Sequence, residues 1–157
     1  MVAWFMMYSR SCLTSSQGKT VQISAFVGNI IKNWEAFPIL IVVPNSTITN
    51  WVREFVRWAP NLTVVPFHGE SKARDVIKQY ELYHPTNRTG TSRVKYHVLV
   101  TTYDSISNVK DFTSVFKAVR RWEVLVVDEG QRREFDRFLF FFSLFLIWHG
   151  TTFHSEE

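Results

Sequence analysis

Cysteine is almost absent from this chain, with Cys12 the only one among 157 residues. A single cysteine excludes an intramolecular disulfide, which fits a reducing compartment. With only five scattered histidines beside it, a zinc site is not expected either. Excess charge is also scarce. The formal net charge of +4 is compatible with a nucleic-acid partner but does not demonstrate one.

Apolar runs long enough to cross a bilayer, which takes about 20 residues, are lacking as well. The densest run, FLFFFSLFLIW, spans only residues 138–148. The apolar patch at the start lacks the basic segment that precedes a signal peptide's core. We therefore expect no membrane partner. Hydrophobic residues make up 46% and charged residues 20%, and 157 residues suit one globular domain.

The middle of the chain alternates apolar, β-branched runs with helix-like periodicity. Strands are predicted at residues 39–43, 62–66, 97–101 and 124–128, and helices at residues 21–34, 45–60 and 70–83. This alternation predicts an α/β fold, a parallel sheet with helices on both faces. Ligands of such sheets bind at the carboxyl ends of the strands.

Helical spacing also predicts which side chains turn inward. The expected inward positions are Val21, Ala25, Ile30 and Trp34 in the first helix, Ile48, Trp51, Val52, Phe55 and Trp58 in the second, and Val76, Ile77 and Tyr80 in the third. The aromatic residues of the second helix are interpreted as core rather than as platforms for stacking nucleic-acid bases.

The triplet Gly18-Lys19-Thr20 has the pattern of a phosphate-binding loop where it enters a helix. Backbone N–H groups at a helix start bind anions, a lysine supplies a point charge, and a hydroxyl can reach Mg²⁺. An ordinary helix start is the alternative. The apolar run that ends in Asp128-Glu129 supplies the matching acids. Asp128 could hold Mg²⁺ and Glu129 could orient or deprotonate a water. The alternative for this acidic pair is an ordinary strand end exposed to solvent.

Three ordered blocks carry a specific resemblance: PILIVVPNSTITNWVREFVRWAPNLTVVPFHG at 38–69, YHVLVTTYDSI at 96–106 and WEVLVVDEGQR at 122–132. They resemble chromatin-remodelling ATPases of the SWI/SNF type, helicase superfamily 2, nearest the chromodomain-helicase remodellers. The resemblance implies an incomplete, RecA-like first helicase lobe at residues 18–132, between divergent segments at 1–17 and 133–157. An unrelated phosphate-loop NTPase or kinase would not need the first block.

The resemblance also implies ATP and Mg²⁺ as cofactors, and duplex DNA, nucleosomes and a multi-subunit complex in the nucleus as partners. Lys19 and Glu129 would be catalytic, and Gly18, Lys19, Thr20 and Asp128 would bind the cofactor, with Thr20 and Asp128 at the metal. Ser46, Thr47, Asn50, Thr101 and Thr102 would touch the DNA backbone. Helix capping is the alternative for Ser46, Thr47 and Asn50.

The pattern departs from the family at both ends. Ser16 stands where the family's loop has a glycine, whose backbone wraps phosphates at positive φ. The segment 133–157 has no counterpart in the family, and we expect the second lobe, with the arginines that complete the ATP site, to be missing. Two functions therefore stay open: an ATPase lobe of a remodeller, or a catalytically inactive lobe that keeps DNA or histone contact. We expect the isolated chain to hydrolyse ATP barely above background.

Overall fold

The computed structural model describes residues 3–5, 17–84 and 94–128. Its strands are β1 (Ala3–Phe5), β2 (Ile39–Val42), β3 (Val64–Phe67), β4 (Val98–Thr101) and β5 (Val124–Val127). Its α-helices are α1 (Gln17–Trp34), α2 (Ile48–Trp58), α3 (Ser71–Ile77), α4 (Tyr103–Ser107) and α5 (Val109–Asp111). A 3₁₀ turn, Asn45–Thr47, precedes α2, and π turns follow α3 (Lys78–Leu82) and α5 (Phe112–Phe116).

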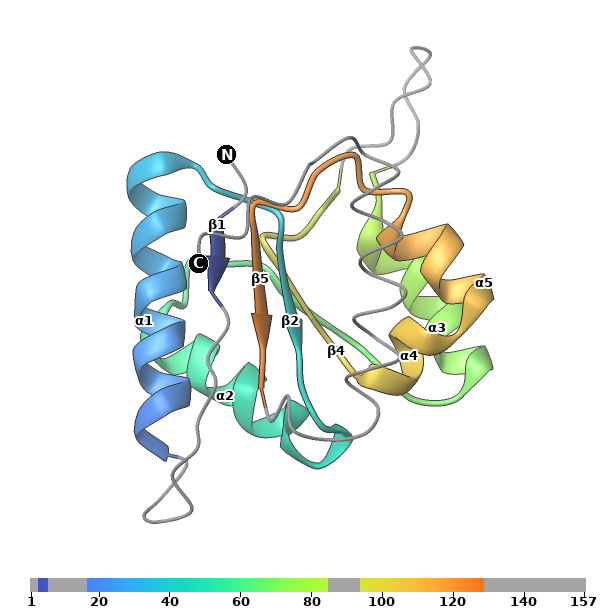
Figure 1. Cartoon of the computed structure of the whole chain (residues 1–157), viewed down its shortest axis with the longest axis horizontal. Helices are drawn as coiled ribbons and strands as arrows, with labels where there is room; N and C mark the ends of the chain where they lie inside the picture. The colour runs from blue at the N-terminus through green and yellow to red at the C-terminus, as the bar shows by residue number, and fades with distance from the viewer. Residues whose placement is uncertain (1–2, 6–16, 85–93, 129–157) are drawn as a thin grey trace, which may run out of the picture.

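The five strands form one sheet in the order β1-β5-β2-β4-β3, and every neighbouring pair is parallel. Ile39 at the start of β2 lies level with Val98 in β4 and with Val124 in β5. The helices α1 and α2 cover one face, and α3, α4 and α5 lie on the other (Figure 1). The predicted α/β fold with a parallel sheet is therefore confirmed.

All four predicted strands are present, with small shifts of their ends. The strand expected at residues 62–66 runs instead from Val64 to Phe67. The three-residue strand β1 was not predicted, because so short a segment offers too few alternating positions to stand out. Within the described parts of the chain, none of the helices is long and apolar enough to cross a membrane.

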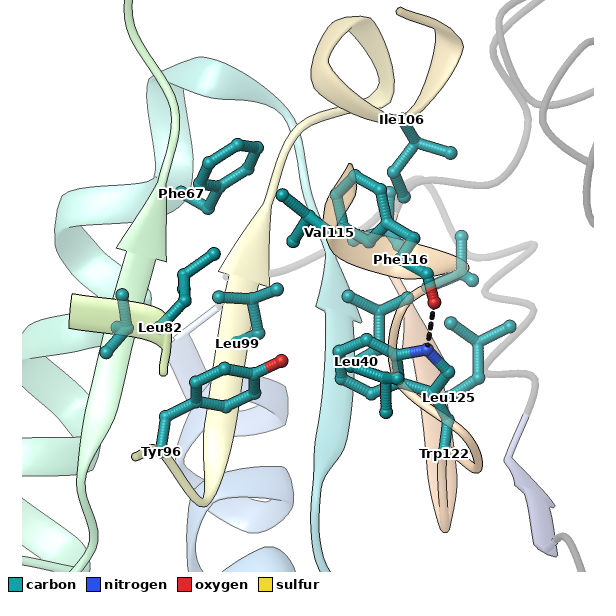
Figure 2. Close-up of a cluster of buried hydrophobic side chains, with 14 of the residues drawn as sticks. Leu40, Phe67, Leu82, Tyr96, Leu99, Ile106, Val115, Phe116, Trp122 and Leu125 are labelled. Carbon is teal, nitrogen blue, oxygen red and sulfur yellow. Dashed lines mark hydrogen bonds between the residues drawn. The ribbon is translucent and has the colours of Figure 1, made fainter. Parts of the chain in front are cut away.

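The sheet separates two hydrophobic clusters. Leu40 and Val42 of β2 face the cluster on the α3–α5 side, while Ile39, Ile41 and Val43 face the cluster beneath α1 and α2. Burial on both faces explains why the strands are continuous apolar runs instead of alternating ones. Figure 2 shows the first cluster, in which the Trp122 indole donates a hydrogen bond to the Phe116 carbonyl at 3.1 Å.

The inward face of α1 differs from the prediction. The buried apolar positions are Ile23, Val27, Ile30 and Ile31, whereas Ala25 and Trp34 are exposed. Ala25 lies two residues from Ile23, a rotation of roughly 200° around the helix, so it points away from the sheet. Trp34 is the last residue of α1, and its side chain is 77% exposed. Of the expected set, only Ile30 is buried.

The second helix follows the prediction except at its end. Ile48, Trp51 and Phe55 are buried and Val52 packs partly against them, but Trp58 is 48% exposed. The Trp58 indole donates to Glu54 at 2.8 Å, so the side chain lies along the outside of the helix. The interpretation of Trp58 as a core residue is therefore wrong.

The third helix is also corrected. Val76 and Tyr80 are exposed, and of the three expected side chains only Ile77 packs against the core. The hydrogen bonding changes from α to π between α3 and Lys78–Leu82. The wider π turn shifts the register of the face that meets the sheet. Leu82 becomes the fully buried residue of this segment instead of Tyr80.

Candidate functional site

The residues predicted to bind phosphate and metal lie at one edge of the sheet. The helix α1 runs opposite to the strands, so that its first turn lies toward the end at which β5 terminates (Figure 1). This turn carries Gly18, Lys19 and Thr20, and Asp128 directly follows β5. The carboxyl edge is where parallel α/β sheets bind ligands.

Both groups also lie on the same face of the sheet. Val124 and Val126 of β5 belong to the cluster beneath α1 and α2. Side chains alternate along a strand, so the Asp128 side chain points to that face too. A hydrogen bond confirms the direction, since the Trp51 indole of α2 donates to Asp128 Oδ2 at 3.2 Å. The arrangement is compatible with one nucleotide site, and the assigned roles stay predictions.

The first turn of α1 offers a mixed set of polar groups. Gly18 is exposed, Lys19 is half-buried and Thr20 is only 5% exposed. Among the described residues, nothing lies within 4 Å of the place where a Cβ on Gly18 would stand. Gly18 therefore has open space on the side where a side chain would project. An approaching phosphate would meet backbone N–H groups there.

Asp128 is held at three points. Its N–H donates to the Val42 carbonyl at 2.9 Å, which extends the sheet by one bond beyond β5. Its own carbonyl accepts a hydrogen bond from the Tyr103 hydroxyl at 2.6 Å. Its Oδ2 accepts from the Trp51 indole N–H. These bonds fix both the backbone and the carboxylate of Asp128.

This donor set suits Mg·ATP. An ammonium group and helix N–H groups suit phosphates, and carboxylate and hydroxyl oxygens are ligands that Mg²⁺ accepts. Two other predicted features, the acid Glu129 and the loop position Ser16, lie outside the described residues. The segment 133–157 lies outside them as well.

Ser46, Thr47 and Asn50 lie beyond the carboxyl end of β2, at the same edge as Asp128. Ser46 and Asn50 are exposed and Thr47 is half-buried. Thr47 is the N-cap of α2 by position, but its hydroxyl donates to the Pro44 carbonyl at 2.9 Å and accepts nothing from the helix. Side-chain capping by Thr47 is therefore not observed, and the DNA role of the three residues stays a prediction.

Thr101 and Thr102 both have internal partners. Thr101 is fully buried, and its hydroxyl donates to the Phe67 carbonyl at 2.9 Å. Thr102 is the N-cap of α4, where its hydroxyl accepts from the Ser105 N–H at 3.2 Å. A direct contact between the Thr101 hydroxyl and a phosphate would require its present bond to open. Their predicted DNA contact remains untested.

Sequence reasoning missed two residues of the site. Trp51 was expected in the core, which is correct, and Tyr103 was assigned no role. Both are aromatic side chains with a polar group that needs a partner when buried. That rule indicates that a buried Trp51 must find an acceptor. It does not say that the acceptor is Asp128, 77 residues away.

The family of SNF2-related domains matches residues 13–139 of this chain. The curated relatives include "Protein CHROMATIN REMODELING 4" of Arabidopsis thaliana, 46% identical over 120 residues that cover 73% of this chain and 5% of the relative. "Chromatin remodeling factor mit1" of Schizosaccharomyces pombe is 38% identical over 127 residues, 81% of this chain and 8% of the relative. "Chromodomain-helicase-DNA-binding protein 1" of Gallus gallus is 33% identical over 138 residues, which cover 85% of this chain and 8% of the relative. The chain thus spans less than a tenth of these relatives.

A solved structure shares the fold. It is the Sulfolobus solfataricus SWI2/SNF2 ATPase core in complex with double-stranded DNA, with a TM-score of 0.52 and 24% sequence identity. The match covers 76% of this chain and 22% of that chain. It shows that the parallel sheet and its helices have the architecture of part of that ATPase core.

Proposed function

This chain belongs to the family of SNF2-related domains, and from that premise we propose that it supplies the ATP-binding lobe of a DNA-dependent ATPase that remodels nucleosomes by translocation along DNA. One observation carries the proposal. The first turn of α1 and the Asp128 carboxylate lie at the same edge and on the same face of the sheet. Phosphate-binding and metal-binding groups must meet there if the site works.

In this proposal each residue has a distinct task. The Lys19 ammonium and the N–H groups of the first turn of α1 bind the β- and γ-phosphates. The Thr20 hydroxyl and Asp128 hold Mg²⁺, which when bound neutralises charge that develops on the phosphates. Glu129, the next residue after Asp128, orients the attacking water and accepts its proton.

DNA would lie along the same edge. Ser46 and Asn50 are exposed just beyond β2, and short polar side chains suit phosphate contacts that carry no sequence information. The mild positive net charge of +4 fits such a partner. The relatives are named as chromatin-remodelling factors, so we propose nucleosomes as the substrate, the nucleus as the location and a multi-subunit complex as the setting.

Nucleotide binding tests the site directly. Lys19→Ala and Asp128→Asn are each expected to weaken binding of Mg·ATP by about tenfold or more, which corresponds to about 1.4 kcal/mol. The measurement is titration calorimetry on the purified chain. Lys32→Ala is the matched control, because Lys32 is an exposed lysine in the last turn of the same helix. Equal affinities for the Lys19 variant and the wild type would contradict the nucleotide site.

The second candidate is a catalytically inactive lobe that retains DNA or histone contact. The observation that favours it is Ser16, which replaces the loop glycine of the family. We expect the 157-residue chain, assayed alone, to hydrolyse ATP barely above background. An arginine supplied in trans accounts for about 10³–10⁵ of the rate in related phosphate-loop enzymes, and the assay contains no other protein that could supply one. An ATPase assay with and without duplex DNA decides: robust DNA-stimulated turnover would refute this expectation and the inactive-lobe alternative.

A further inference from the structure

Two buried donors from opposite faces of the sheet converge on Asp128. Trp51 belongs to α2 on one face and is 2% exposed, and its indole N–H donates to Oδ2 at 3.2 Å. Tyr103 is the first residue of α4 on the other face and is 3% exposed, and its hydroxyl donates to the main-chain carbonyl at 2.6 Å. Asp128 is thus bonded through both its side chain and its backbone.

The position of Asp128 makes these bonds matter. The strand β5 ends at Val127, and the Asp128 N–H still donates to the Val42 carbonyl of the neighbouring strand. That backbone bond by itself does not fix the rotamer of the carboxylate. The Tyr103 bond restrains the peptide that leads to residue 129, and the Trp51 bond restrains the carboxylate.

We propose that Trp51 and Tyr103 are positioning residues for the metal-binding acid. Trp51 binds Oδ2 and so fixes the orientation of the carboxylate, while Tyr103 fixes the backbone from which the carboxylate projects. Partners of this kind that orient a metal ligand typically change metal affinity by about 10–100-fold when removed. The inference rests on the proposed nucleotide site and assigns to it two residues outside the phosphate-binding loop and the acidic pair.

A competing explanation is that both aromatic residues only fill the core. Trp51 does belong to the cluster beneath α1 and α2, and Tyr103 to the cluster on the other face. A packing role predicts that a variant affects stability and leaves the dependence on Mg²⁺ alone. A positioning role predicts a change in that dependence even where the fold is intact.

The test compares Trp51→Phe and Tyr103→Phe with the wild-type chain. Each variant keeps a ring in the core and removes one donor, and Tyr103→Phe removes only a hydroxyl, which leaves a testable variant if Trp51→Phe folds poorly. Calorimetry measures ATP binding with and without Mg²⁺. We expect the Mg²⁺ concentration at half-saturation to rise about tenfold in each variant, with metal-free ATP binding unchanged.

Two control variants remove similar groups elsewhere. Trp58→Phe removes an indole that donates to Glu54 on the outside of α2, and Tyr83→Phe removes a hydroxyl that lies 3.4 Å from the carbonyls of Ser114 and Val115. Both should leave the Mg²⁺ dependence unchanged. If Trp51→Phe and Tyr103→Phe also leave it unchanged, the inference is overturned while the nucleotide site stands. If the wild-type chain binds no Mg·ATP at all, the proposed function fails, and the metal role of both donors fails with it.

Discussion

Replacing Phe55 by alanine is expected to lower the free energy of unfolding by about 3–5 kcal/mol, the range for truncating a buried aromatic side chain. Phe55 is fully buried in the cluster between α2 and the sheet, and its ring centroid lies 6.4 Å from that of Trp51. The stability of a whole domain is only about 5–15 kcal/mol, so the loss is a large share of it. Urea unfolding followed by circular dichroism measures the change.

The next residue supplies the control. Val56 lies on the same helix but is 65% exposed, so Val56→Ala should change the free energy of unfolding by no more than about 0.5 kcal/mol. The contrast depends on the side of α2 that faces the sheet. Comparable losses for Phe55→Ala and Val56→Ala would mean that α2 does not pack as described.

The sheet was predictable because its strands are buried on both faces. Runs such as residues 39–43 and 124–127 are apolar at every position, and no helical period explains them. The inward faces of the helices were harder to predict. Trp58 and Tyr80 have the spacing of core residues, yet both are exposed. One lies at the end of its helix and the other in a π turn, and neither circumstance can be read from apolar spacing alone.

The site was predictable in part for a different reason. In a parallel sheet, residues that follow an apolar strand or begin the next helix lie at the carboxyl edge. The position of Asp128 and of the turn at Gly18 at this edge could therefore be predicted from the sequence. The donors to Asp128 could not. They come from residues 77 and 25 positions away, and only the packing of α2 and α4 on opposite faces brings Trp51 and Tyr103 to it.

Asp111 of α5, on the face of the sheet opposite α1 and α2, is a buried carboxylate (Figure 1). The Asp111 side chain is 4% exposed and accepts from Arg74 Nε at 2.7 Å and from Lys78 Nζ at 2.5 Å. Arg74 also donates to the Gly69 carbonyl. These bonds tie α3 and the π turn after it to α5. Removing one partner of a buried ion pair leaves uncompensated charge behind, at a cost of about 3–5 kcal/mol.

Asp111→Ala is therefore expected to lower the free energy of unfolding by about 3–5 kcal/mol, toward the lower end because Arg74 and Lys78 retain some contact with solvent. Asp75→Asn is the matched control. Asp75 pairs with the same Lys78 at 3.1 Å but is 65% exposed, so its loss should cost about 0–1 kcal/mol. Urea denaturation measures both variants. Equal effects of the two substitutions would show that the burial of Asp111 is not what makes its ion pairs stabilising.

The ion pairs of Lys78 with Asp111 and Asp75 should contribute less to the stability of the fold at alkaline pH. Partial burial by itself lowers the pKa of Lys78, but hydrogen bonds to Asp111 and Asp75 and the charges of both carboxylates outweigh it, and the pKa is raised above its ordinary 10.5. A group with a raised pKa binds its proton more tightly in the folded state. Its contribution to stability is therefore complete below pH 10.5 and is lost as the pH rises through the folded value. Urea midpoints should fall less steeply with pH above 10.5 in Lys78→Met than in the wild type, because the variant has no proton there to lose. Parallel slopes in the two proteins would contradict the raised pKa of Lys78.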